Sequence, residues 1–217
     1  MKLVNFDIPL PLVTGTMAEK KQQRKKAIIN SAYKLFVEKG VGKTSIDDIV
    51  KGAKMAKGTF YLYFKDKEEL LDDMIYLLCS DAVASASNLL DLEQAKNQNM
   101  EIGDSVVFFS KKLFDILFEN REMMPIIHKN LSKGLFVFNS PDNSIKAIIK
   151  RFEVQFVQLG GSCEEAMKRL YMIVEIVNSV FYNAVMDEKP YKFEEIEPLL
   201  LTLIRNMAYP EIAEKRE

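Results

Sequence analysis

The spacing of the apolar residues constrains the fold more than any other feature, because they recur every three or four positions along most of the chain. No window alternates apolar and polar residues convincingly with the period of two that a half-buried strand shows. Turn signals divide the pattern and predict helices at 21–39, 44–53 and 56–64, from 67 onward, and at 103–119, 121–131, 143–158, 162–186 and 193–208. We therefore expect an all-α protein.

Local signals fix several helix ends. Gly40 is a natural cap after the first helix. Helix starts should carry a short polar residue with an acidic residue three positions later, which together satisfy free backbone N–H groups. Such pairs occur at Thr44 and Asp47, Asp66 and Glu69, and Ser162 and Glu165. The Gly, Ser, Pro and Asn residues of 132–142 predict a loop.

The composition argues against several classes of protein. His128 is the single histidine, which disfavours metal sites with two histidine ligands and enzymes that depend on a histidine base. Cys79 and Cys163 suit small buried apolar positions in a reducing cytosol. Hydrophobic residues make up 48% and charged residues 28% of the chain, without an apolar run long enough for a membrane span. We expect a cytoplasmic protein that is not an enzyme and has no catalytic residue, metal, cofactor or membrane partner.

The charge is unevenly distributed. Between Lys20 and Lys67 there are 13 basic and 4 acidic residues, a formal charge of +9, whereas the rest of the chain carries −10. A near-neutral protein thus contains a basic head on an acidic body. This asymmetry predicts a polyanionic partner for the head.

The basic head contains two short predicted helices, 44–53 and 56–64, that follow a longer one. This is a helix-turn-helix arrangement, in which the second helix lies in the DNA major groove and the first crosses the backbone. Small residues at Ala56, Gly58 and Thr59 allow close approach to DNA. A cation and two phenol groups for phosphates or bases come from Lys57, Tyr61 and Tyr63.

The runs TSIDDIV (44–50), AKMAKGTFYLYF (53–64) and KEEL (67–70) resemble the amino-terminal signature of the TetR family of bacterial transcriptional regulators. The resemblance covers about 25–74. Two positions depart from it: Lys54 stands where the family usually has Gly, and Ala56 stands where Ser often caps the recognition helix. Loss of that cap costs about 0.5–2 kcal/mol.

The resemblance implies which residues meet DNA. Phosphate-contacting positions correspond to Thr44, Tyr61, Tyr63 and Lys67, and positions that approach bases or adjacent phosphates correspond to Lys57, Gly58 and Thr59. Each has an alternative role, since Thr44 could cap its helix and the tyrosines could pack. Phe60 and Phe64 are expected in the core. The basic run 20–26 is either a solvated face or a phosphate contact.

The resemblance also implies an architecture. It comprises an amino-terminal three-helix helix-turn-helix DNA-binding domain (17–66) and a carboxyl-terminal helical ligand-binding and dimerisation domain (67–217). Residues 1–16 are expected to be a disordered or non-native arm, because Asp7, Pro9 and Pro11 interrupt their apolar stretch and no cleavage pattern follows.

Phe and Met residues between 106 and 182 are candidates for an adaptable ligand cavity, although ordinary core packing is the commoner role for any one of them. The candidate lining residues are Phe114, Phe118, Met124, Phe152 and Phe156. A polar and aromatic stripe follows at i, i+4, i+7 and i+11: Tyr171, Glu175, Asn178 and Tyr182. The stripe is a solvent face, a dimer rim or a pocket wall. His128 is either a polar anchor in the pocket or a hydrogen-bonded structural residue.

The resemblance implies a homodimeric, ligand-responsive regulator that binds double-stranded operator DNA, and the composition of the chain fits this. We expect a repressor that a lipophilic small-molecule effector releases, because a ligand preferring another separation of the two recognition helices lowers operator affinity. The alternative is a helical small-molecule-binding or scaffold protein without sequence-specific DNA binding.

Overall fold

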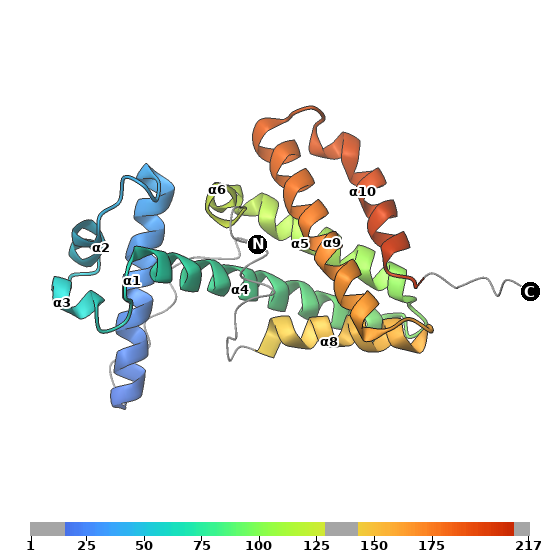
Figure 1. Ribbon diagram of the computed structural model, residues 1–217, viewed down its shortest axis with the longest axis horizontal. Helices are drawn as coiled ribbons and strands as arrows, with labels where there is room; N and C mark the ends of the chain where they lie inside the picture. Colours follow the sequence, from blue (N-terminus) through green and yellow to red (C-terminus); the bar gives the residue numbers. More distant parts are fainter. Residues whose placement is uncertain (1–15, 129–142, 211–217) are drawn as a thin grey trace, which may run out of the picture.

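A computed structural model describes residues 16–128 and 143–210, and every regular element within these ranges is a helix (Figure 1). The prediction of an all-α fold is confirmed. The predicted loop 132–142 and, apart from Thr16, the predicted arm 1–16 lie outside the described residues.

Three helices form a unit at one end of the molecule: α1 (Met17–Lys39), α2 (Ile46–Gly52) and α3 (Lys57–Phe60). The long helix α4 (Lys67–Lys96) leads from this head into the body (Figure 1). Leu70 and Met74 of α4 are fully buried in the head core. The first turns of α4 therefore belong physically to the head, and the domain division at residue 66 stays a prediction.

The body contains the remaining elements. They are α5 (Ile102–Glu119), a 3₁₀ turn (Arg121–Met123), α6 (Met124–Ile127), α8 (Asn143–Gln158), α9 (Cys163–Tyr182), a π-helical turn (Asn183–Asp187) and α10 (Phe193–Met207). Helix α4 packs against α5 and α8, α9 packs against α8 and α10, and α10 covers α5. Figure 1 shows α9 crossing the body between α8 and α10.

Some helix ends differ from the predictions. The first helix begins at Met17 instead of 21, because the Thr16 hydroxyl accepts from the Glu19 N–H while the Glu19 carboxylate accepts from the Thr16 N–H. The third helix is four residues long and ends at Phe60. The predicted helix 121–131 is a 3₁₀ turn followed by one α-turn to Ile127. The α-helical part of 162–186 ends at Tyr182.

The short helix α6 joins two apolar cores. Its Ile126 and Ile127 are buried with the head residues Ile49 and Phe60. Met124, at its start, packs in the body core, whose buried members also include Phe114, Ile173, Phe181, Phe193, Leu200 and Ile204. A displacement of α6 would therefore change the packing of both the head core and the body core.

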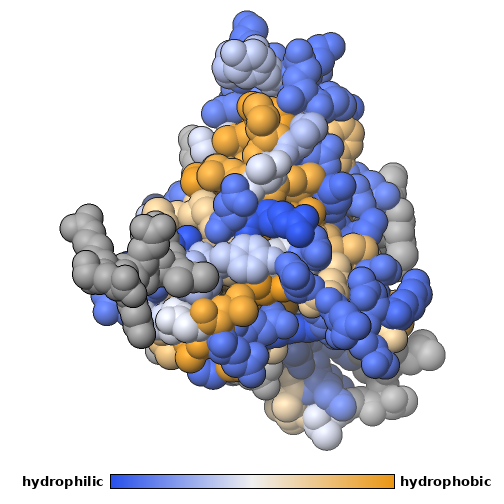
Figure 2. Space-filling view, turned by 90° about the vertical axis from the view of Figure 1, so that its right-hand side faces the viewer, coloured by the Kyte–Doolittle hydropathy of each residue, from blue (hydrophilic) through white to orange (hydrophobic). Residues whose placement is uncertain are grey.

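Large apolar side chains remain exposed on α9 and α10. Tyr171 and Met172 on α9 are 50% and 45% exposed, and Leu199 and Leu203 on α10 are 67% and 42% exposed. Figure 2, which looks onto the side of the molecule that carries α10, shows apolar residues gathered between polar ones. Within 16–128 and 143–210, no helix combines the length and apolar character needed to cross a membrane.

Candidate nucleic-acid interface and effector cavity

The turn between α2 and α3 is a Schellman motif. The Met55 N–H donates to the Val50 carbonyl at 2.8 Å, and the Lys54 N–H donates to the Lys51 carbonyl at 3.1 Å. Lys54 has a φ of 55°, the left-handed conformation that glycine adopts without cost. The departure from the family pattern at Lys54 thus falls on the one residue of this turn whose backbone favours glycine. Ala56 occupies the N-cap position of α3 and makes no side-chain hydrogen bond, because alanine has no polar side-chain atom.

Ser45 caps α2. Its hydroxyl accepts from the Asp48 N–H at 3.1 Å, and the Asp48 carboxylate accepts from the Ser45 N–H at 3.1 Å. The prediction that Thr44 begins this helix with Asp47 is wrong by one residue. Thr44 is 2% exposed, so its side chain is directed into the protein, and the neighbouring Ser45 is the residue in position to cap.

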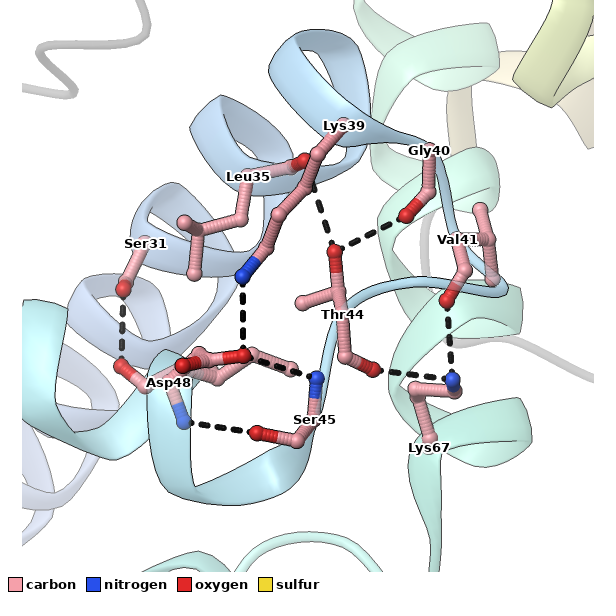
Figure 3. Close-up of polar contacts among 10 residues, drawn as sticks. Ser31, Leu35, Lys39, Gly40, Val41, Thr44, Ser45, Asp48 and Lys67 are labelled. Atoms are coloured by element: carbon pink, nitrogen blue, oxygen red, sulfur yellow. Dashed lines mark hydrogen bonds and ion pairs between the residues drawn. The ribbon is translucent and has the colours of Figure 1, made fainter.

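Thr44 and Lys67 hold the loop between α1 and α2 against α4 (Figure 3). The Thr44 hydroxyl donates to the Gly40 carbonyl at 2.9 Å. The Lys67 ammonium donates to the carbonyls of Val41 and Thr44 at 2.8 and 2.9 Å. Both side chains were predicted to contact phosphate, but here their polar atoms bind backbone carbonyls. Their observed contacts position α2 relative to α4.

An ion pair also connects the end of α1 to the first turn of α2. The Lys39 ammonium lies 2.8 Å from the Asp48 carboxylate, which also accepts from Ser45 (Figure 3). The hydrogen bond from Lys39, followed by those from Ser45, holds the pKa of Asp48 well below its usual range. Asp48 therefore stays ionised at neutral pH and keeps the start of α2 fixed to the end of α1.

Four of the predicted DNA-contacting residues lie on or beside α3 with part of their surface exposed. Lys57 and Gly58 are exposed, Thr59 is half-buried, and Tyr61 is 53% exposed. A Cβ at Gly58 would meet no protein atom within 4 Å, so this backbone is open to an approaching molecule. The Lys57 ammonium pairs with Asp47 at 3.0 Å, which raises the pKa of Lys57 and keeps it charged. This surface can offer a cation, a hydroxyl and a phenol to DNA.

The opposite side of the same segment is the head core. Phe60 and Phe64, four positions apart, are 0% and 1% exposed, with ring centroids 5.6 Å apart. This confirms that both residues belong to the core. Tyr63 is half-buried and packs against this core. Its contribution to DNA contact stays a prediction.

Two further exposed residues were not singled out from the sequence. Leu62 is 72% exposed, and the Lys65 side chain is 84% exposed. The signal for Leu62 was present, because in the helix predicted at 56–64 a residue two positions from each of two core phenylalanines faces away from the core. Leu62 and Lys65 are therefore additional candidates for the surface that meets DNA.

The body contains an apolar cavity in two adjoining compartments. The first, of about 140 Å³, is lined from α4, α5, α6 and α9, and the second, of about 130 Å³, is lined from α4, α5, α8 and α9. They share six lining residues: Val83, Val106, Phe109, Leu113, Leu170 and Val174. Burial raises the pKa of Cys79, which lines the first compartment, to about 12, so this thiol is uncharged at neutral pH.

Four of the ten residues predicted to bind a ligand line this cavity. Phe114, Met124 and Asn178 line the first compartment, and Phe152 lines the second. Phe118 is 42% exposed and outside both linings. Phe156 is fully buried in the core under Gly161, where a Cβ would lie 2.1 Å from its ring. The positions of Phe118 and Phe156 argue against contact with a ligand in this cavity.

The polar stripe on α9 divides along its length. Tyr171 is half exposed and hydrogen-bonds Glu175, which raises the pKa of Tyr171, and neither residue lines a compartment. Asn178 is buried, and its amide donates to the His128 carbonyl at 3.0 Å. His128 also has its Nδ1 3.2 Å from the Asn178 Oδ1 and stacks on Tyr182 at 4.0 Å. His128 and Tyr182 thus hold the end of α6 against α9 instead of lining the cavity.

Comparison with known proteins adds to this geometry. Residues 28–74, which contain the helix-turn-helix, match the family described as bacterial regulatory proteins, tetR family. The chain is 30% identical over 172 residues to YuxN of Bacillus subtilis (strain 168), an uncharacterized HTH-type transcriptional regulator, covering 76% of this chain and 56% of YuxN. It is 32% identical over 92 residues to IcaR of Staphylococcus aureus (strain Newman), a negative transcriptional regulator of a biofilm operon, covering 42% of this chain and 47% of IcaR.

The chain thus spans about half the length of these curated relatives. A solved structure of the transcriptional regulator FadR from Bacillus subtilis, in complex with stearoyl-CoA, has a similar fold with a TM-score of 0.52 and 18% identity, covering 83% of this chain and 97% of that one. The helix-turn-helix geometry, the family match and the curated relatives agree. The helix-turn-helix region of the chain, residues 28–74, thus belongs to the tetR family of bacterial regulatory proteins.

Proposed function

We propose that this protein is a transcriptional regulator that docks α3 and the turn after it into the major groove of operator DNA. The observation that carries the proposal is the exposed surface of Lys57, Gly58, Thr59 and Tyr61 within a head of formal charge +9. Basic side chains next to exposed backbone and phenol groups are what phosphate and base-edge contacts require.

The head residues divide into two groups in this proposal. Lys57, Tyr61, Leu62 and Lys65 meet DNA, because their side chains are exposed on one short segment. Thr44 and Lys67 act by positioning α2, because their polar atoms bind backbone carbonyls. The separation between 17–66 as the DNA-binding part and 67–217 as the responsive part is retained as part of the proposal.

The effector is proposed to be lipophilic and to occupy the two-compartment cavity. The lining is almost entirely aliphatic and aromatic, with Ser110, Asn120 and Asn178 as the polar members of the first compartment. Such a lining favours hydrocarbon or aromatic groups. The stearoyl-CoA bound by the Bacillus subtilis FadR, which has the same fold, supports a ligand of this type.

The regulator is proposed to act as a homodimer and as a repressor. The exposed apolar side chains of α9 and α10 supply a face for a twofold interface. A ligand that prefers a different separation of the two recognition helices then releases DNA through its differential affinity alone. The role of IcaR as a negative regulator supports repression.

Binding to a fluorescent DNA fragment from the region flanking its own gene tests the DNA-binding proposal. Anisotropy titrations at several salt concentrations should give salt-sensitive binding by the wild type. Lys57→Gln should weaken binding and reduce the slope of log K against log salt by about one. Lys96→Gln, which removes an exposed lysine at the end of α4, is the matched control and should change neither quantity.

Two results would contradict the proposal. Equal, salt-insensitive affinity for the flanking fragment and unrelated DNA would favour the alternative of a small-molecule-binding or scaffold protein. Unchanged affinity and slope in both Lys57→Gln and Tyr61→Ala would show that the head docks through another surface.

A further inference from the structure

The second compartment of the cavity has a polar end. Arg151 of α8 lines this compartment, and its guanidinium binds the Asp91 carboxylate at 2.5 Å and the Gln94 side-chain oxygen, both on α4. The Gln94 amide donates to the Ser105 hydroxyl of α5 at 2.8 Å. A hydrogen-bonded chain therefore links three helices at this end of a largely apolar space.

Arg151 gives the cavity an electrostatic direction. Among the described residues that line the two compartments, Arg151 alone carries a charge. Asp91 lines neither compartment and is 58% exposed, whereas the Arg151 side chain is 29% exposed. An anion arriving through the cavity can therefore take the place of Asp91 on the guanidinium, and Asp91 can then return to water. Arginine binds carboxylate and phosphate through two parallel hydrogen bonds.

The size of the cavity limits the length of the apolar part of a bound ligand. An apolar cavity of roughly 150 Å³ holds one benzene molecule, so the two compartments in series suit a chain of about twelve carbon atoms. The lining residues on α4 extend from Leu78 in the first compartment to Leu90 in the second. Twelve helical positions span about 18 Å, which matches an extended chain of that order.

We propose that the effector is an amphiphile with one anionic head, carboxylate or phosphate, bound by Arg151, and an apolar tail that passes through the second compartment into the first. The tail then ends beside Met124, Ile127 and Asn178, the residues that border or hold α6. This assignment rests on the proposed function and names the ligand class of the same cavity.

Calorimetric titration with dodecanoate, below its micelle concentration, tests the assignment on the full chain. Arg151→Gln should weaken dodecanoate binding about tenfold or more, because a charge-assisted pair is lost. Asp91→Asn should strengthen it, because the competing carboxylate is removed. Both variants break the same bridge between α4 and α8, so a merely structural role would shift both affinities in the same direction.

Three comparisons complete the design. Lys150→Gln removes a neighbouring cation of α8 that pairs with Glu153 outside the cavity, and it should leave binding unchanged. 1-Dodecanol, which has the tail without the charge, should bind the wild type more weakly and be insensitive to Arg151→Gln. Dodecyl phosphate in place of dodecanoate distinguishes a phosphate head from a carboxylate head.

The assignment is overturned if neither anionic amphiphile binds the wild type, or if Arg151→Gln binds dodecanoate as tightly as the wild type does. Release of the operator fragment is measured separately. Arg151-dependent binding without release of DNA would uphold the site and contradict the proposed ligand response. Release of DNA by uncharged lipophiles alone would uphold the proposed ligand response and contradict the anion site at Arg151.

Discussion

At the scale of single residues, Lys54 occupies a backbone position that suits glycine better. A left-handed conformation costs a residue with a Cβ about 1–2 kcal/mol, and Lys54 adopts it with a φ of 55°. We predict that Lys54→Gly raises the free energy of unfolding by about 1 kcal/mol, measured by urea denaturation. Lys54→Ala removes the same charge but retains the Cβ, so it should not stabilise the protein. Equal stability of the two variants would show that loss of the charge, and not relief of backbone strain, accounts for any gain over the wild type.

Asp48 should make the stability of the protein depend on pH. Its pKa is lowered in the folded state, first by the hydrogen bond from Lys39. The stabilisation is therefore fully present above the unfolded pKa of about 4 and is lost as the pH falls toward the lower folded value. We predict that the stability difference between the wild type and Asp48→Asn shrinks between pH 7 and pH 3 in urea denaturation. A difference that stays constant with pH would contradict the role of this ion pair, and Lys39→Met should reduce the pH dependence.

At the scale of elements, the contact between α1 and α2 depends on the absence of a side chain at Gly52. A Cβ there would lie 2.3 Å from the Ser31 hydroxyl oxygen, which donates to the Ile49 carbonyl at 2.7 Å. We predict that Gly52→Ala destabilises the protein by about 1–3 kcal/mol in thermal or urea unfolding.

A double mutant separates the clash from helix propensity. The Ser31 Cβ lies 3.5 Å from the added atom, which is an ordinary contact, so Ser31→Ala should relieve the clash. Gly52→Ala should therefore cost less in a Ser31→Ala background than in the wild type. The same cost in both backgrounds would place the origin of the destabilisation elsewhere.

At the scale of the whole molecule, the exposed apolar face of α9 and α10 should control assembly. Leu203 is 42% exposed in the single chain, so Leu203→Asp adds a charge without opening the core. We predict that this change converts a dimer into a monomer at micromolar concentration in sedimentation experiments, because a carboxylate buried in an interface lacks a partner. Val154→Asp, at a 43% exposed position of α8, is the control and should leave the dimer intact. A stable wild-type monomer would exclude the proposed interface.

The sequence alone predicted those features of the structure that depend on residues close together in the chain. Apolar periodicity and turn residues predicted α8 at 143–158 with the observed bounds and α10 to within one residue. The i, i+4 spacing of Phe60 and Phe64 placed both in the core, since neighbouring turns of a helix present one face. The motif around α3 was enough to predict the family. These inferences succeed because backbone hydrogen bonding and side-chain spacing act over a few residues.

The tertiary structure decided which polar atoms are free. Spacing alone could not assign the α2 cap to Ser45, because Thr44 and Ser45 have acidic residues at the same separation and only the packing of Thr44 against α1 excludes it. Lys67 looks available from the sequence, but its ammonium binds carbonyls 23 and 26 positions away. Likewise, the stripe from Tyr171 to Tyr182 shares one helix face, and only its neighbours make one part exposed and another buried. Burial depends on which distant segments meet, and local spacing carries no information about that.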